Sequence, residues 1–401
     1  MREIVGSVTA VEGVSASGVS AGIKGDGKPD LALIFCERPA AAAGVFTTNL
    51  VKAAPVLLSQ SRVKSGKAQA IVANSGNANA CTGPEGFEDA KRMARIAAEE
   101  LGIDPKLVLV ASTGVIGVRL PMDKIEKGIK AAVKALNPKG GHEAARAIMT
   151  TDKVPKECAV ELEVGGEKVR IGAIAKGAGM IRPNMATMLC FITTDVDIEP
   201  EILQRALKES VDRSFNRITV DGDMSTNDMV LILATGSAGN PKISSPQQEE
   251  YARFREGLDY VTMKLARMIV EDGEGATKLI TVTVKGARDE REAEMAARAV
   301  AGSLLVKTAM FGMDPNWGRV AAALGASGAV FNPEQLDIWF DDVQIVKGGV
   351  ATDYDEEQVK RLLFKNNIRI TADLNAGQAE ATIWTCDLTD EYIKINAHYR
   401  T

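Results

Sequence analysis

The sequence predicts a mixed α/β fold, an α+β arrangement of layered sheets and helices. Helix-like and strand-like segments follow one another irregularly, so that some expected strands form hairpin-like pairs and others are separated by a helix. Apolar residues make up 45% of the 401 positions, which is enough for a large core or two packed domains. Because the alternation is irregular, a repeating βαβ fold is not expected.

Two segments carry apolar residues at helical spacing. In residues 88–101 and 122–136 the apolar side chains recur every three or four positions and fall on one face, as in helices that pack against a core. The other predicted helices are 199–211, 247–270, 289–301 and 355–366. Asp289 is expected to cap the helix that begins there.

Short β-rich runs lie between the predicted helices. They are 31–35, 69–72, 108–111, 159–164, 169–174, 189–193, 229–235, 280–284, 336–340, 368–374 and 381–388. Gly165-Gly166 separates two of them and predicts a tight hairpin. Residues 236–246 are rich in Gly, Pro and Ser and are expected to form an exposed loop.

Charge and hydropathy exclude several classes of partner. The net charge is −5, and no block of Lys and Arg offers a surface for nucleic acid or an anionic membrane. No apolar run reaches roughly 18 residues, and Glu3 and Glu12 interrupt the N-terminal segment, so neither a membrane span nor a secretory signal is expected. The protein is expected to act in the cytoplasm on a small molecule or a peptide.

Cysteine and histidine usage narrows the possible chemistry. The five cysteines lack a CxxC pair and are expected to be buried thiols in a reducing cytosol. They are Cys36, Cys81, Cys158, Cys190 and Cys386. The only histidines are His142 and His398, which rules out a His-rich metal site, and His142 is expected in a solvated loop. The reaction must therefore depend on other side chains.

Segments rich in Gly, Asn and Asp are interpreted as turns, and no metal or nucleotide cofactor is predicted. Asp221, Asp223 and Asp228 lack the spacing and the closing glutamate of a Ca²⁺-binding EF-hand loop. Gly177-Ala-Gly179 is too short for a dinucleotide-binding fingerprint. Three such blocks are expected to form a scaffold around a pocket: 74–83, 217–228 and 311–319.

The most informative segment is KGAGMIRPNMATML, which begins at Lys176. Its glycines and Pro183-Asn184 require a tight backbone, and the chain then enters an apolar strand at Thr187 or Met188. A hydroxyl thus stands at the junction of a strained loop and a strand. Taken alone, a threonine at the start of a strand is most often structural.

This segment closely resembles the self-cleavage motif of the ornithine acetyltransferase family, and the similarity extends from GVSASGVSAGIK near the N-terminus to NAHYRT at the end. In that family the precursor cuts itself between the alanine and threonine of ATML. The resemblance implies cleavage between Ala186 and Thr187. The products would be an α-chain, 1–186, and a β-chain, 187–401, which would carry the nucleophile at its first residue.

Cleavage at this point makes chemical sense. A threonine hydroxyl is a poor nucleophile at neutral pH, whereas a free α-amino group titrates near pH 8 and lies on the same residue. Attack of Thr187 Oγ on the Ala186 carbonyl, eased by a strained loop, would give an ester that water hydrolyses. The cut would create the base, so acyl transfer would need no histidine.

Both steps need donors for a tetrahedral oxyanion. The segment ASTGVIG, residues 111–117, follows a predicted strand and matches the STGVIG motif of the family. The resemblance assigns the Thr113 hydroxyl and the Gly114 backbone N–H as these donors. Taken alone, Ser-Thr-Gly commonly marks the end of a strand.

An acetylated amino acid presents a carboxylate, an amide and an acetyl carbonyl, so its pocket needs a cation and several polar groups. By resemblance the substrate-binding residues are Thr150 or Thr151, Lys176, Thr187, Glu274, Asn396 and Thr401. The two threonines are not distinguished. Thr401 implies that the chain end is buried in the active site, where termini usually fray. Without the resemblance, Lys176 and Glu274 would be interpreted as solvated charges.

The resemblance implies a ping-pong reaction. N-acetylornithine would acetylate Thr187, ornithine would leave, and glutamate would take the acetyl group to give N-acetylglutamate. The family assembles as an α2β2 heterotetramer, with no cofactor. Some members also take acetyl-CoA as the donor, and the sequence leaves this open.

Two other functions remain as alternatives. A self-cleaving aminopeptidase or amidohydrolase would pass the acyl group to water, and exclusion of water from the acyl-enzyme distinguishes it from a transferase. An uncleaved, non-catalytic homologue would be a binding or scaffold protein. The complete set of motif residues argues against the latter.

Overall fold

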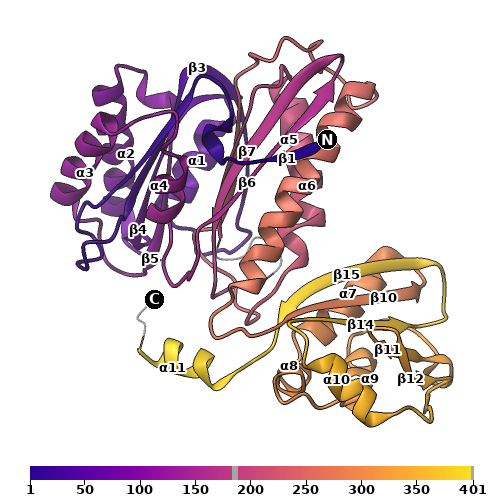
Figure 1. The fold of residues 1–401 in the computed structure, drawn as a ribbon. Coiled ribbons are helices and arrows are strands. Elements are labelled where there is room, and N and C mark those ends of the chain that lie inside the picture. Colours follow the sequence, from indigo (N-terminus) through magenta and orange to yellow (C-terminus); the bar gives the residue numbers. More distant parts are fainter. Residues whose placement is uncertain (183–187, 399–401) are drawn as a thin grey trace.

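The computed structural model describes residues 1–182 and 188–398, and its strands form two sheets (Figure 1). The larger sheet contains β1 (Arg2–Ile4), β2 (Val14–Val19), β3 (Leu31–Phe46), β4 (Lys67–Asn77), β5 (Val108–Val115), β6 (Lys156–Val164), β7 (Glu167–Lys176), β8 (Leu189–Thr194) and β9 (Met229–Ala234). Its order is β1-β6-β7-β8-β9-β3-β4-β5, and β2 pairs with β3. Ala186, Thr187 and Thr401 lie outside the described residues.

Strand β3 divides the larger sheet into two facing halves. Its first part pairs with β4 and its last part with β9, and the register shifts between Phe35 and Ala40. One apolar cluster contains Ile71 of β4 together with Phe191 of β8 and Leu231 of β9, so the two halves pack face to face. The C-terminal ends of β4, β5 and β7 consequently meet at one end of the molecule.

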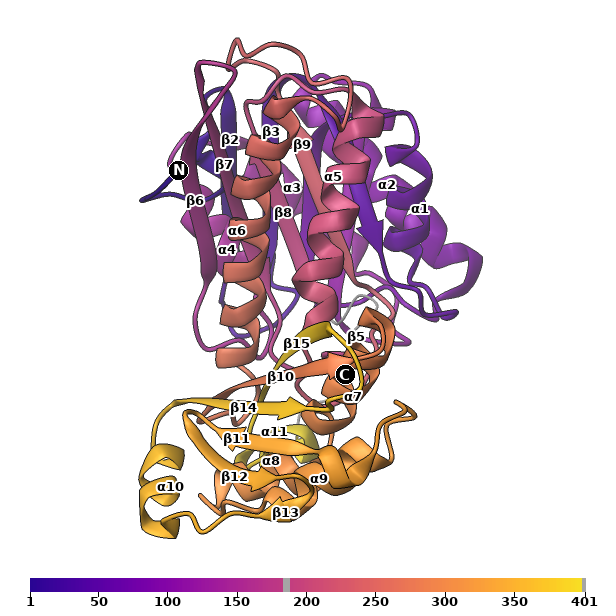
Figure 2. The same cartoon turned by 90° about the vertical axis from the view of Figure 1, so that its right-hand side faces the viewer.

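Helices cover the outer face of each half (Figures 1 and 2). The half containing β4 and β5 packs against α1 (Ala54–Val63), α2 (Gly83–Leu101) and α3 (Met122–Lys134). The half containing β6 to β9 packs against α5 (Pro200–Arg213) and α6 (Glu249–Glu271). The short helix α4 (Gly141–Ala147) contributes alanines to the core between the halves. The arrangement is four-layered, helix, sheet, sheet and helix, which confirms the predicted mixed α/β class.

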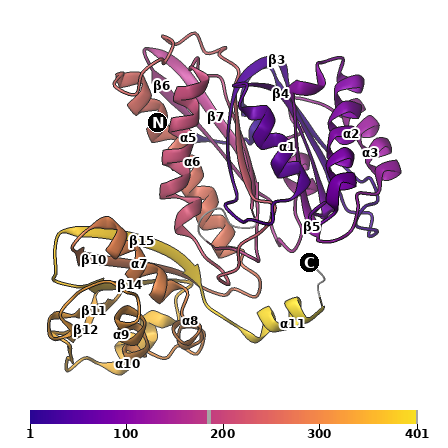
Figure 3. The same ribbon diagram turned by 180° about the vertical axis from the view of Figure 1, so that it is seen from behind.

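The smaller sheet forms a separate part with its own core (Figure 3). Its elements are β10 (Leu279–Ala287), α7 (Glu290–Ala301), α8 (Leu304–Phe311), α9 (Trp317–Gly325), β11 (Asp337–Phe340), β12 (Val343–Lys347), β13 (Val350–Ala351), α10 (Glu356–Leu363), β14 (Asn367–Asp373) and β15 (Ala379–Cys386). The strand order is β13-β12-β11-β14-β10-β15. After β15, α11 (Asp390–His398) returns toward the larger part.

Most predicted elements are present, with shifted ends. All six predicted helices occur, and the Asp289 carboxylate accepts a hydrogen bond from Glu292 N at 2.8 Å, so the predicted cap is confirmed. Gly165 and Gly166, with φ of 59° and 87°, join β6 to β7 as the predicted hairpin. The strand predicted at 31–35 continues to Phe46, because Pro39 lies where the register shifts and interrupts no ladder there.

Two surface predictions need correction. His142 is exposed but belongs to α4 and not to a loop, and its Nδ1 lies 2.9 Å from Glu157 Oε1. Cys81, which lies in the connection before α2, is exposed, whereas the other four cysteines are buried. Within residues 1–182 and 188–398, no helix combines the length and apolar character needed to cross a membrane.

Candidate active site

A pocket of about 230 Å³ lies at the end of the larger part where β5 and β7 terminate. It is lined by every predicted site residue that the structure describes: Thr113, Gly114, Thr150, Thr151, Lys176, Glu274 and Asn396. These residues come from five segments that are far apart in the sequence. The predictions for Ala186, Thr187 and Thr401 concern residues outside the described part of the chain.

Thr113 and Gly114 lie near the C-terminal end of strand β5, beside the end of β4. Gly114 pairs with Gly76, and a Cβ added to Gly114 would lie 2.4 Å from the Gly76 carbonyl carbon. The Gly114 φ of 132° also favours glycine. Two glycines therefore allow the backbones of β4 and β5 to approach closely, and this approach brings the Thr113 side chain and the Gly114 backbone to the pocket.

The segment before β9 supports this corner. The Asn227 amide donates to the carbonyl oxygens of Ala78 at 2.7 Å and Ser112 at 2.8 Å, which ties the ends of β4 and β5 together. Blocks 74–83 and 217–228 thus adjoin the pocket, as predicted. Block 311–319 does not, because it connects α8 to α9 in the smaller part, and its predicted place at the pocket was wrong.

Lys176, the last residue of β7, is a buried cation at the pocket wall. Its Nζ lies 3.9 Å from Asp152 Oδ2. Burial lowers the pKa of Lys176, and the Asp152 carboxylate opposes that shift. Burial likewise works against ionisation of Asp152, but the charges of Lys176 and Lys156 outweigh it and hold the Asp152 pKa well below its ordinary value.

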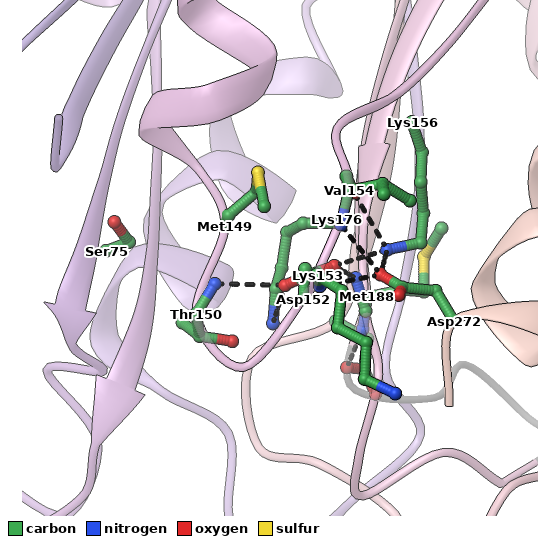
Figure 4. Close-up of polar contacts among 12 residues, drawn as sticks. Ser75, Met149, Thr150, Asp152, Lys153, Val154, Lys156, Lys176, Met188 and Asp272 are labelled. Carbon is green, nitrogen blue, oxygen red and sulfur yellow. Dashed lines mark hydrogen bonds and ion pairs between the residues drawn. The ribbon is translucent and has the colours of Figure 1, made fainter. Parts of the chain in front are cut away.

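Asp152 also connects the two backbones that carry predicted substrate contacts (Figure 4). Its Oδ2 accepts from Thr150 N at 2.9 Å, and its Oδ1 accepts from Gly177 N at 2.7 Å. Thr150 and Thr151 both line the pocket, so the structure does not separate the two alternatives.

Glu274 precedes the smaller part in the sequence and Asn396 follows it, and both reach the pocket. Glu274 lies between α6 and β10 and Asn396 in α11, yet Asn396 Nδ2 donates to Glu274 Oε2 at 2.7 Å. Glu274 is only 6% exposed. Gly179 leaves room for it, because an added Cβ would lie 2.4 Å from the Glu274 carboxyl carbon and would displace that side chain.

Comparison with known proteins gives matches along the whole chain. The ArgJ family profile matches residues 15–401. The chain is 58% identical over 403 aligned residues to the arginine biosynthesis bifunctional protein ArgJ of Symbiobacterium thermophilum, with 100% of both chains covered. It is 51% identical over 405 aligned residues to the protein of the same name from Caldanaerobacter subterraneus subsp. tengcongensis, again with full coverage.

The chain belongs to the ArgJ family. A solved structure, the arginine biosynthesis bifunctional protein ArgJ of Bacillus halodurans, superposes with a TM-score of 0.50 at 43% identity, covering 52% of this chain and 97% of that one. ArgJ membership confirms the resemblance found in the sequence and the predicted enzyme class, an acetyltransferase of arginine biosynthesis. The roles of individual residues stay predictions.

The sequence did not identify Asp221 and Tyr392 as neighbours in this pocket. Asp221 accepts hydrogen bonds from Met180 N at 2.6 Å, Ile181 N at 2.9 Å and the Tyr392 hydroxyl at 3.2 Å. Met180 has a φ of 56°, so this carboxylate holds an unusual turn and anchors α11 to it. Burial raises the pKa of Asp221. In the sequence, the Asp-Gly-Asp segment was compared with a Ca²⁺-binding loop, and that interpretation was rejected. Nothing in this segment indicates a contact with Tyr392, which lies 171 residues away.

Asp228 is a second acid whose environment the sequence did not reveal. It is fully buried, and its Oδ1 accepts from Met188 N at 3.0 Å. Among the described residues its Oδ2 has no hydrogen-bond partner. Burial raises the pKa of Asp228 well above its ordinary value, with the Met188 amide opposing. In the sequence, Met188 directly follows Thr187, which lies outside the described residues.

Proposed function

We propose that this protein transfers an acetyl group from N2-acetyl-L-ornithine to L-glutamate through an acetyl-Thr187 intermediate. The nucleophile would arise by self-cleavage between Ala186 and Thr187. The observation that carries the proposal is the register of β8, because Leu189 pairs with Lys176 at the pocket wall. The chain therefore enters β8 beside the pocket, two residues after Thr187.

In the first half-reaction, Thr187 Oγ attacks the acetyl carbonyl of N-acetylornithine. The α-amino group of Thr187 takes the hydroxyl proton and passes it to the amide nitrogen as the C–N bond breaks, which releases ornithine. The Thr113 hydroxyl and the Gly114 N–H donate to the oxyanion that forms in between. In the second half-reaction the glutamate amine attacks the acetyl ester, and Thr187 Oγ recovers its proton.

The pocket offers complementary groups for the part that the two substrates share. Both are amino acids with an α-carboxylate, for which Lys176 is the cation, and with an α-nitrogen, which Glu274 receives. Thr150 or Thr151 supplies a hydroxyl, and Asn396 holds Glu274 from the opposite side. Because the substrates occupy the pocket in turn, one set of contacts serves both.

Assembly and donor range extend the proposal. We expect an α2β2 heterotetramer of 1–186 and 187–401 acting in the cytoplasm, and a reaction from acetylornithine that needs no metal or cofactor. The Bacillus halodurans chain aligns with 52% of this chain along 97% of its own length, as expected for one chain of a processed protein. The relatives are named bifunctional, which supports acetyl-CoA as a second donor to glutamate.

Intact-mass spectrometry tests the proposal. The wild-type protein should give two fragments that separate before Thr187, the Thr187→Ser protein should also cleave, and Thr187→Ala should remain whole. Incubation with N-acetylornithine should add one acetyl group to the C-terminal fragment, and glutamate should remove it. Steady release of acetate in place of N-acetylglutamate would identify the hydrolase alternative. An uncut wild-type chain without activity would refute the mechanism.

A further inference from the structure

The group of charges behind the pocket has a feature that substrate contact does not explain. Lys156 is fully buried, lines no part of the pocket and lies between two carboxylates. Its Nζ donates to Asp152 Oδ1 at 2.7 Å and to Asp272 Oδ2 at 2.6 Å. A buried ion pair is costly to form and is weak evidence for stability, so its presence behind the pocket points to a positional role.

The two carboxylates differ in what else they contact (Figure 4). Asp272 Oδ2 accepts from Lys153 N at 3.0 Å and pairs with Lys156, and within residues 1–182 and 188–398 none of its hydrogen-bond partners lines the pocket. Asp152 faces Lys176 at 3.9 Å, and it accepts from the backbone N–H groups of Thr150 and Gly177. Of the two carboxylates, only Asp152 therefore joins Lys156 to the pocket wall, as far as the described residues show.

We infer that Asp152 is a positioning residue, which holds Lys176 and the Thr150-Thr151 backbone as one unit and keeps Lys176 cationic for a carboxylate-bearing substrate. Lys156 contacts Asp152 from behind, and Asp272 contacts Lys156 without contacting Asp152 among the described residues. The inference rests on the proposed function for the identity of the substrate. Its structural part, the dependence of Lys176 on Asp152, does not.

The geometry explains why Lys176 needs this support. The Lys176 side chain is 3% exposed, and burial disfavours its ammonium form. The charged groups that face it come from several elements: Asp152, Lys156, Asp228, Glu274 and Lys24. Two of these are cations, and the pKa of Asp228 is raised by burial, so Asp152 is the nearby anion that favours the Lys176 charge most strongly.

The test compares Asp152→Asn with Asp272→Asn. Each variant removes one carboxylate from Lys156, and each leaves Lys156 the other, so the two share the disturbance of the buried pair. Only Asp152→Asn removes a charge from Lys176. In Asp152→Asn the Lys176 pKa should fall further, so the ammonium is lost at lower pH. KM for N-acetylornithine should rise about tenfold at alkaline pH, and the alkaline fall of kcat/KM should move to lower pH.

Asp272→Asn should leave that alkaline limb where the wild-type protein has it, and Asp152→Glu should restore it in part. A role confined to folding would lower the yield or the activity equally at every pH. An unchanged alkaline limb in Asp152→Asn, or an equal shift in both variants, would overturn the inference.

A measurement without turnover separates this inference from the proposed reaction. Titration of ¹³C-labelled lysine side chains by NMR, with the Lys176 signal assigned through Lys176→Met, reports the charge of Lys176 directly. Its midpoint should fall in Asp152→Asn and not in Asp272→Asn. If acetyl transfer is absent but the midpoint shifts, only the proposed function fails. If transfer is present and the midpoint does not shift, only the positioning role fails.

Discussion

Buried charged side chains gather around the pocket at the end of the larger sheet, whereas the buried Lys307 of the smaller part donates to Thr385 and Cys386 and lines no part of the pocket. Lys156, Lys176 and Asp228 are buried at that end of the larger part. The core cluster of the smaller part consists of aliphatic residues, methionine and aromatic residues such as Phe340. Among the described residues, those that line the pocket therefore come from the larger part and from the two segments that enter and leave the smaller part.

These two segments are tied to each other at the neck of the smaller part. Asp387 accepts from Thr277 N at 2.8 Å and from Lys278 N at 2.9 Å, and the Thr389 hydroxyl donates to Gly275 O at 2.8 Å. The chain leaves the pocket just after Glu274 and returns to it in α11. The smaller sheet thus supports the site by fixing the positions of the two chain segments that connect it to the pocket.

The largest expected effect lies in the apolar core of the smaller sheet. Phe340→Ala removes a fully buried ring and should lower the free energy of unfolding of that part by about 3–5 kcal/mol. Chemical denaturation followed by fluorescence measures the loss. At a temperature where the variant stays folded, kcat should equal the wild-type value. A reduced kcat there would mean that the smaller part does more than support the pocket.

At the end of β5 we expect a substitution to lower kcat and to leave stability nearly unchanged. Thr113→Val keeps the shape of the side chain but removes the proposed oxyanion donor, so kcat should fall about 10²–10³-fold, or about 2.7–4 kcal/mol. Self-cleavage should slow as well, because it passes through the same kind of oxyanion. Thr308→Val, which removes a hydroxyl bonded within α8, is the matched control. If Thr113→Val and Thr308→Val have equal kcat values, the catalytic groups are not confined to the larger part.

Local patterns predicted the elements and motifs, whereas contacts between distant segments could not be predicted. Apolar periodicity located α2 and α3 because each covers a core face, and start and stop signals located α5, α6, α7 and α10, whereas the remaining helices of the described chain were not predicted. Strand β3 was predicted too short. Proline usually interrupts a strand, and only the structure shows that Pro39 lies where the pairing register shifts. Family motifs brought Thr113, Lys176 and Glu274 together. Asp152 and Asp272 were not recognised as partners, because 120 positions separate two carboxylates that meet only through Lys156.

Aspartate-to-asparagine substitutions should change stability in opposite directions at the pocket and at the neck. Asp228 has an oxygen without a partner in the described part of the chain, whereas both Asp387 oxygens accept hydrogen bonds. In an uncleaved Thr187→Ala background, Asp228→Asn should raise the unfolding free energy at neutral pH by about 1–3 kcal/mol. Asp387→Asn should lower it by a similar amount.

The pH dependence of stability checks the sign for Asp228. Burial raises its pKa in the folded protein, so above the ordinary aspartate pKa the folded state keeps a proton that the unfolded state has lost. Stability therefore declines as pH rises through the window between the two pKa values, and Asp228→Asn should remove that decline. Thermal melts from pH 4 to pH 8 measure it, and an unchanged slope would show that Asp228 is already ionised.

The smallest effects come from adding one methyl group in each part. Gly325→Ala places a Cβ at the end of α9 where no atom lies within 4 Å, so it should stabilise the protein by about 0.4–1 kcal/mol and leave KM unchanged. Gly179→Ala places the same atom 2.4 Å from the Glu274 carboxyl carbon, so Glu274 must move and its hydrogen bond from Asn396 must lengthen. KM for N-acetylornithine should then rise about tenfold, a loss of about 1.4 kcal/mol in binding. If Gly179→Ala changes stability but not KM, Glu274 supports the fold of the pocket without contacting substrate. The pocket would then contain both supporting residues and substrate-binding residues.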